Sequence, residues 1–152
     1  MFEIIQINLK GGESMAIEVH LHFNGNCHEA VNFYSKIFDL KEPNIMTYEE
    51  APSEANDSLT DEVKKLVMYT NLKIFGSDVM FSDATPDKPV TQGDNIFLNI
   101  EFNNLEEITS LFNQLKEGGT VLMDLQKTFF AKYYGLLVDK FGIPWQLVYE
   151  TH

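Results

Sequence analysis

The side chains in this sequence best suited to chemistry are two histidines that stand two residues apart. His20 and His22 lie in the stretch IEVHLHF, residues 17–23, where apolar and polar residues alternate. Such alternation predicts a half-buried strand, on which both imidazoles point to the same face. Their Cα atoms would be about 6.5–7 Å apart, close enough for both rings to reach one metal ion. The alternative is that both are polar side chains on a solvated strand face, and we favour that interpretation.

A metal centre would need more than these two rings. Zinc, nickel and iron sites take at least three N, O or S donors at about 2.0–2.2 Å. The third donor would have to come from Glu18, Asn99 or Glu101. The remaining histidines, His28 near a predicted helix start and His152 at the chain end, do not help.

Three other groups could take part in chemistry. Cys27 is the single cysteine, which excludes an intramolecular disulfide and any multi-cysteine metal site. At a helix start its thiol could be reactive, but we expect a buried, inert thiol. Asp78 and Asp83 bracket the stretch VMFS and could act as an acid–base pair, but we expect them to cap turns. No serine nucleophile turn, phosphate-binding loop or zinc-finger spacing is present.

The strand that carries the two histidines opens a regular series of elements. A helix is predicted over residues 26–38, with Asn26 and Glu29 at the spacing of a capping box. A strand is expected within 42–50, followed by a polar loop over 51–62. Residues 64–84 predict two strands with a turn around Gly76-Ser77-Asp78.

The same order then recurs after a break at residues 85–94. A strand is predicted over 95–102, a helix over 104–118, and three strands within 120–126, 131–139 and 145–149. Asn104 and Glu107 repeat the cap spacing of Asn26 and Glu29, 78 residues later. Internal repetition on this scale predicts two copies of strand–helix–strand–strand–strand.

The predicted fold is therefore α+β, with two tandem βαβββ modules in one domain over 15–152. Module one covers about 15–90 and module two about 91–152. Each module would be a four-stranded sheet with a helix on one face, and pairing the two bare faces would form a cleft. Residues 1–14 are expected to be a translated start-site artefact, because Lys10-Gly11-Gly12-Glu13 before Met15 matches what a purine-rich ribosome-binding site would encode. The alternative is a genuine edge strand.

Composition limits the classes of partner. The formal net charge of the 152 residues is −12, with 11 Lys and Arg that form no run. Such a chain repels phosphate backbones and anionic membrane surfaces, so we expect no nucleic-acid and no membrane partner. No apolar stretch approaches the roughly 20 residues of a membrane span, and no secretory signal is visible. We expect a cytoplasmic protein.

Three stretches carry a resemblance to a known family. They are FNGNCHEAVNFYSKIF at 23–38, GSDVMFSD at 76–83 and KTFFAKYYGLLVDKFGIPWQL at 127–147. With the duplicated βαβββ pattern, they resemble the PhnB-like branch of the vicinal oxygen chelate superfamily. That superfamily includes glyoxalase I, extradiol dioxygenases and bleomycin-resistance proteins. The branch has often been called 3-demethylubiquinone 3-methyltransferase. The residues do not support that activity, since no Gly-rich turn follows a first strand and opens a helix of a parallel sheet.

The resemblance also implies where a metal would bind. Metal-dependent relatives place ligands on the first and last strand of each module, which by position here are Glu18, Met80-Phe81, Phe97 and Gln146. Two of these four positions are apolar and cannot supply donors. We therefore predict no metal and no other cofactor.

The prediction that follows is a metal-independent, small-molecule binding protein of the bleomycin-resistance type. The alternative is a metal-dependent lyase, isomerase or dioxygenase resembling glyoxalase I, with His20, His22 and Glu101 as ligands. A homodimer is expected because members of this superfamily build clefts by pairing modules. The net charge is compatible with a flat cationic ligand. The predicted pocket residues are Glu18, His20, His22, Phe97, Asn99, Glu101, Phe129, Tyr134, Trp145 and Gln146.

Overall fold

Two four-stranded sheets, each backed by one long helix, make up the part of the chain described here. The computed structural model describes residues 16–52 and 57–150, so the predictions on residues 1–14 and on His152 lie outside it. The first half contains β1 (Val19–Phe23), α1 (Cys27–Ile37), β2 (Met46–Thr47), η1 (Tyr48–Glu50), α3 (Asp61–Lys64), β3 (Val67–Ile74) and β4 (Ser77–Asp83). The second half contains β5 (Leu98–Phe102), α4 (Leu105–Leu115), β6 (Thr120–Gln126), β7 (Ala131–Val138) and β8 (Pro144–Glu150).

Strand order and register confirm the duplication. The sheets have the orders β1-β4-β3-β2 and β5-β8-β7-β6, and in each the first strand runs parallel to the last. Val19 pairs with Val79 in the first sheet, as Leu98 pairs with Trp145 in the second. The α+β fold of two repeated βαβββ modules is thus confirmed.

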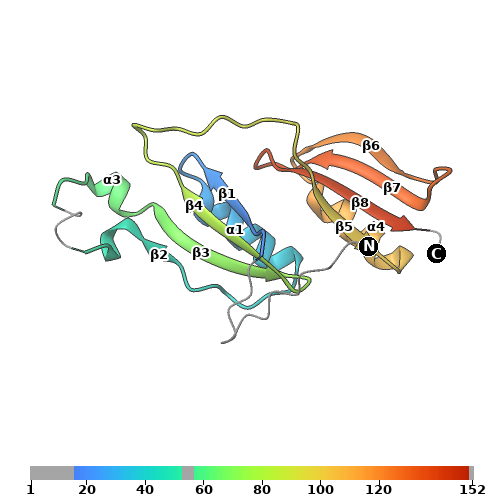
Figure 1. Cartoon of the computed structure of the whole chain (residues 1–152), viewed down its shortest axis with the longest axis horizontal. Coiled ribbons are helices and arrows are strands. Elements are labelled where there is room, and N and C mark those ends of the chain that lie inside the picture. The colour runs from blue at the N-terminus through green and yellow to red at the C-terminus, as the bar shows by residue number, and fades with distance from the viewer. Residues whose placement is uncertain (1–15, 53–56, 151–152) are drawn as a thin grey trace, which may run out of the picture.

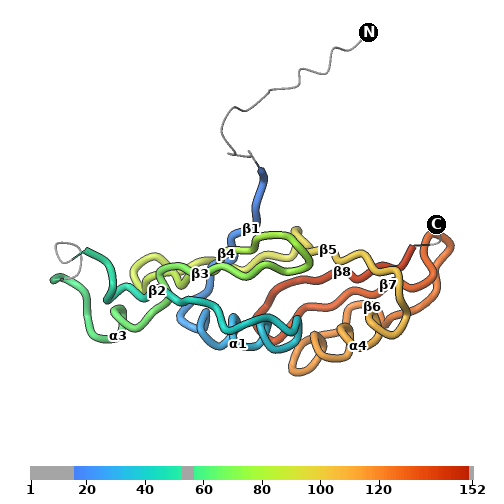
Figure 2. Tube along the Cα trace, turned by 90° about the horizontal axis from the view of Figure 1, so that it is seen from below, coloured from blue at the N-terminus to red at the C-terminus, as the bar shows by residue number. Residues whose placement is uncertain are grey.

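The two modules lie side by side along one chain. Both helices lie under the sheets on the same side, and the other face of each sheet carries no helix (Figures 1 and 2). The bare faces therefore look in the same direction within one chain. The outer strands β1 and β5 border the seam between the modules, and together with the hairpin of β3 and β4 they frame the hollows described below.

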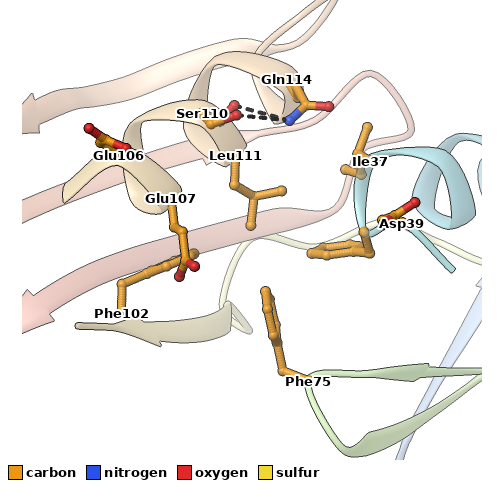
Figure 3. A pocket seen from close by; sticks show the side chains of 10 residues that line it. Ile37, Asp39, Phe75, Phe102, Glu106, Glu107, Ser110, Leu111 and Gln114 are labelled. Atoms are coloured by element: carbon orange, nitrogen blue, oxygen red, sulfur yellow. Dashed lines mark hydrogen bonds between the residues drawn. The ribbon is translucent and has the colours of Figure 1, made fainter. Parts of the chain in front are cut away.

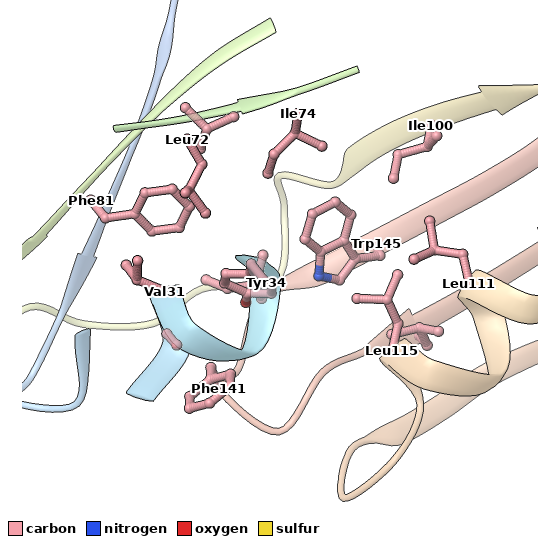
Figure 4. Close-up of a cluster of buried hydrophobic side chains, with 14 of the residues drawn as sticks. Val31, Tyr34, Leu72, Ile74, Phe81, Ile100, Leu111, Leu115, Phe141 and Trp145 are labelled. Carbon is pink, nitrogen blue, oxygen red and sulfur yellow. The ribbon is translucent and has the colours of Figure 1, made fainter. Parts of the chain in front are cut away.

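One hydrophobic core runs under both sheets. Tyr34 of α1 packs with tilted rings against both Phe81 of β4 and Trp145 of β8, with ring centroids 5.8 Å apart in each pair. Leu111 and Leu115 of α4 join the same cluster (Figure 4). Trp145 is only 2% exposed. Burial of large aromatic side chains is the main source of stability in such a domain. The modules therefore share a core across the seam.

The carboxylate of Asp139 joins the modules through hydrogen bonds. It is 3% exposed and accepts from the Tyr34 hydroxyl, from Trp145 Nε1 at 2.8 Å, and from the amides of Phe141 and Ile143 at 2.8 and 3.0 Å. Burial, and next the adjacent Asp139 carboxylate, raise the pKa of Tyr34 well above its usual range. Four donors compensate for the desolvation of this buried carboxylate.

The two helices are capped in different ways, which corrects one prediction. Asn104 accepts from the amides of Glu106 and Glu107 at the start of α4, as its position predicts. Asn26 makes no such bond at the start of α1. The carboxylate of Asp83 takes its place and accepts at 3.0 Å each from the amides of Gly25, Cys27 and Val67.

Some local predictions were wrong. The turn between β3 and β4 consists of Phe75 and Gly76, whereas Ser77 and Asp78 belong to β4. The strand expected within 42–50 is reduced to β2, and the polar loop contains the short helix α3. No helix among the described residues is long and apolar enough to cross a membrane.

Candidate ligand-binding site

The two histidines form a stacked pair on the bare face of the first sheet. The ring centroids of His20 and His22 are 4.1 Å apart, with 26° between the ring planes. Ser82 lies beside them on β4, opposite His22 in register. Its Oγ lies 3.0 Å from His20 Nε2 and 3.0 Å from His22 Nδ1. One buried hydroxyl thus serves both rings.

This packing changes the protonation of one ring. Burial, and next the charge that His22 would carry, lower the pKa of His20 below its ordinary value. His20 therefore binds a proton less readily than an ordinary histidine does. The two rings and Ser82 together form a hydrogen-bonding surface on this face of the sheet.

A second polar row crosses the bare face of the second sheet. Tyr134 of β7 donates to Gln146 Oε1 at 2.8 Å, and Gln146 Nε2 donates to Asn99 Oδ1 at 2.9 Å. Asn99 pairs with Gln146 in register. Since both ends of the Gln146 amide are engaged, the row fixes its orientation and leaves the Asn99 amide nitrogen as a donor.

Two hollows lie along the seam. Seven of the ten predicted pocket residues line one or the other, whereas Phe129, Tyr134 and Gln146 line neither. The first, here the histidine cavity, has a volume of about 530 Å³ and is lined by Glu18, His20 and His22 together with linker residues such as Val90 and Gln92. The second, here the seam cavity, has a volume of about 440 Å³. Its walls include Val19, Phe75, Val79, Phe97, Leu98 and Trp145, with Ser77, Asn99 and Glu101 as polar groups. Val19 and Leu98 line both hollows, so the two are neighbours.

The aromatic residues predicted as pocket walls are placed differently from one another. Trp145 borders the seam cavity but belongs mainly to the core, where Asp139 accepts from its indole. Tyr134 forms part of the polar row. Phe129 is 100% exposed in the connection between β6 and β7 and lines neither hollow. Its ring stacks edge to face on Phe130.

Sequence reasoning missed the contribution of the linker and of Ser82. Val90, Thr91, Gln92 and Gly93 line the histidine cavity, although nothing in their composition marks them as functional. The alternation of VMFSD could have predicted that Ser82 faces the same side of the sheet as the histidines, because Ser82 pairs with His22 in register.

The residues at the family's metal positions do not fit a metal ion. Met80 stands opposite His20, Phe97 has no donor, and Gln146 is engaged at both ends of its amide. Within the described ranges no group of three His, Cys, Asp or Glu side chains could hold an ion. His20 and His22 line one hollow and Glu101 the other, so the alternative ligand set is not brought together within one chain.

Comparison with known proteins assigns the chain to a family. Over residues 15–148 the sequence matches the family described as 3-demethylubiquinone-9 3-methyltransferase. The chain belongs to this PhnB-like family. The PhnB-like chain is 30% identical to protein YjdN of Escherichia coli strain K12 over 139 residues, which are 88% of this chain and 94% of that protein.

Solved structures show the same fold. The PhnB-like chain is similar to PA1353 from Pseudomonas aeruginosa, with a TM-score of 0.76 at 30% identity, over 91% of this chain and 100% of that chain. It is also similar to a PhnB protein from Bacillus cereus, with a TM-score of 0.71 at 29% identity, over 89% and 99% of the two chains. A glyoxalase/bleomycin resistance protein/dioxygenase family enzyme from Burkholderia phytofirmans shares the fold alone, at 13% identity and a TM-score of 0.58 over 88% and 97%.

The geometry does not provide the nucleotide-type site that the family's description suggests. In the common, doubly-wound type of nucleotide site, the ligand binds at a Gly-rich turn between a strand and the start of a helix. Here the turn before α1 contains only Gly25, and the free amides at the helix start already bind the Asp83 carboxylate. In this PhnB-like chain the start of α1 is therefore occupied by the carboxylate of Asp83 and is not free to bind a ligand.

Proposed function

We propose that this chain is a metal-independent small-molecule binding protein that holds a flat, cationic ligand in the seam cavity. The observation that carries the proposal is the make-up of that cavity. Apolar walls from both modules enclose about 440 Å³, and Asn99 and Glu101 are among its few polar groups. Small-molecule sites are usually largely apolar hollows of this size with a few convergent polar groups.

Two features support a cationic ligand. Glu101 supplies a carboxylate, and no Lys, Arg or His lines the seam cavity. The protein as a whole carries a net charge of −12, which raises the local concentration of cations. Phe97 and Phe75 offer aromatic surface on which a planar ligand can stack.

A fluorescence titration with proflavine, a flat aromatic cation, tests the proposal. Glu101→Gln should weaken binding about three- to tenfold, because it removes a charge and keeps the shape of the side chain. The matched control is Glu117→Gln, which removes the same charge from an exposed position after α4 and should leave binding unchanged. Absence of saturable binding, or equal effects of the two variants, would contradict the proposal.

We also propose that the bare faces are covered by a second copy of the chain. Tyr69 and its register partner Met46 are 41% and 42% exposed. Strand alternation puts Tyr69 on the face opposite the buried Thr70 and Leu72, which is the face that no helix covers. Exposed apolar side chains on an uncovered sheet commonly mark an interface. Light scattering should give twice the 17.4 kDa chain mass, and Tyr69→Asp should lower it to one chain mass. The control Asn32→Asp, on the exposed face of α1, should stay dimeric.

The alternative is a metal-dependent lyase, isomerase or dioxygenase, and the stacked pair of His20 and His22 is the observation that keeps it in view. Elemental analysis of protein purified without a histidine tag separates the two functions. Binding without metal predicts no stoichiometric zinc, nickel, iron or manganese. About one equivalent that is lost in His22→Ala would support the metalloenzyme instead.

A further inference from the structure

A third hollow lies on the helix side of the molecule, away from the stacked histidines. It is a groove of about 430 Å³ between the end of α1, the tip of the β3–β4 hairpin and α4 (Figure 3). We call it the helix-side groove. Its walls come from both modules, and its volume is that of a small-molecule pocket. None of its lining residues is among those predicted for the ligand pocket.

Three phenylalanines from three elements surround this groove. Phe75 stands between the other two, with its ring centroid 5.7 Å from that of Phe38 and 6.1 Å from that of Phe102. Both contacts are edge to face, at 85° and 80°. Leu111 of α4 lies across from Phe75 in Figure 3. Rings set at right angles to one another present π-faces in more than one direction, as in the aromatic cages that bind quaternary ammonium groups.

Phe75 adopts a backbone conformation that is unfavourable for a bulky side chain. Its φ is 47°, and it is 68% exposed. Positive φ is uncommon for a bulky residue, whereas Asn-Gly is the preferred sequence for a two-residue hairpin turn of this kind. Asp39, with φ 52°, is the other non-glycine residue with positive φ in the described ranges, and it lines the same groove.

The charge at the rim has one sign. Asp39, Glu106 and Glu107 line the groove, and none of its lining residues is basic. Within the ranges that the structure describes, none of these three carboxylates takes part in an ion pair. In Figure 3 the Glu107 side chain extends toward Phe102, and Asp39 lies on the opposite side of the groove. An unneutralised acidic rim over an aromatic wall is complementary to an organic cation.

We propose that the helix-side groove binds a free small molecule that carries a quaternary ammonium group on an apolar body. The ammonium group lies between Asp39 and Glu107 against the phenylalanine rings, and the apolar body covers Leu111. This site goes beyond the proposed seam-cavity function. Phe75 lines both hollows, but the carboxylates differ, so the carboxylate variants distinguish the failure of one proposal from the failure of the other.

Calorimetric titration with benzyltrimethylammonium tests the site. The double variant Asp39→Asn, Glu107→Gln should weaken binding about tenfold or more, because it removes both charges from a largely apolar hollow. Asn tolerates positive φ as well as Asp does, and Gln keeps the helix, so the variant should fold. The matched control Glu117→Gln, at an exposed position outside both hollows, should keep wild-type affinity. Loss of binding in Glu101→Gln alone would place the cation in the seam cavity and overturn this proposal.

Phe75→Asn provides a second test, in which stability should be kept or increased while binding is weakened. The change restores the favoured Asn-Gly turn, so the melting temperature should stay equal or rise. Binding of benzyltrimethylammonium should fall at least about fivefold, because the central ring is lost. A variant that folds as well as wild type and binds equally well would overturn the proposal.

Neutral and surface-bound analogues complete the test. Benzyl alcohol, which lacks the charge, should bind far more weakly than benzyltrimethylammonium. Phosphatidylcholine vesicles present the same trimethylammonium group on a membrane and should not sediment with the protein. Co-sedimentation that Asp39→Asn, Glu107→Gln abolishes would assign the groove to a lipid headgroup and overturn the free ligand proposed here.

Discussion

The hydroxyl of Tyr34 donates to the carboxylate of Asp139, 105 positions further along the chain. The first residue belongs to the helix of module one and the second follows β7 of module two. This bond crosses the seam inside the shared core, next to Trp145. The modules are therefore held together by a polar contact as well as by apolar packing.

Removing the Tyr34 hydroxyl should measure how much this hydrogen bond between the modules contributes to stability. Tyr34→Phe should lower the free energy of unfolding by about 1.5–3 kcal/mol, as is usual for a buried hydrogen bond to a charged group. Urea denaturation followed by circular dichroism gives the value. The control Tyr69→Phe removes a hydroxyl from a side chain that is 41% exposed and should change stability by less than about 0.5 kcal/mol. Equal effects would show that the bond contributes nothing.

The different caps of the two helices predict an asymmetric response. Asn104→Ala should cost about 1 kcal/mol, because two amides of α4 lose their acceptor. Asn26→Ala should cost less than about 0.5 kcal/mol, since Asn26 makes no cap bond. Asp83→Ala should cost about 3 kcal/mol or more, because three amides are left without their partner. Denaturation midpoints compare the three, and a large effect at Asn26 would contradict this account.

The lowered pKa of His20 predicts that acid destabilises the fold. The unfolded chain binds a proton at its ordinary pKa of about 6.5, whereas folded His20 binds it only at lower pH. Stability is therefore complete above about pH 6.5 and falls as the pH drops toward the folded pKa. His20→Gln should flatten the dependence of the unfolding free energy on pH below about pH 7. A variant with the same slope as the wild type would contradict this account.

Cys27 should resist modification in the folded protein. The thiol is buried, and its pKa is raised far above its usual range, first by burial and then by the charge of Asp83. Ellman's reagent should react with it only after unfolding, so the rate should follow the population of unfolded protein across a urea titration. Rapid reaction in buffer would show an accessible thiolate.

Much of this architecture follows from patterns in the sequence. Five segments with periods of two or 3.6 residues became β1, α1, β5, α4 and β7 close to their predicted bounds, because each buries one face. The repeat was recognisable because Asn26 and Asn104 begin equivalent helices. The capping box at Asn26 was wrong because Asp83, distant in sequence, competes for the same amides.

The candidate sites were harder to predict, for a physical reason. Strand alternation shows that His20 and Asn99 face away from the core, but it does not show how two modules pack. Side-by-side packing leaves His22 and Glu101 in different hollows. Phe129 lies exposed in the connection between β6 and β7. The helix-side groove depends on Phe75, which occupies a turn position with positive φ. Propensity rules favour Asn or Gly at such a position, so they do not predict a phenylalanine there.

The core that runs under both sheets also makes the two duplicated modules dependent on each other. Because Tyr34, Phe81 and Trp145 are buried in one core that both modules share, each module alone would expose apolar side chains to water. The peptide of residues 84–97 is then a tether and not a hinge. We therefore expect that two fragments produced by cutting this segment would fold only together, as a complementation pair.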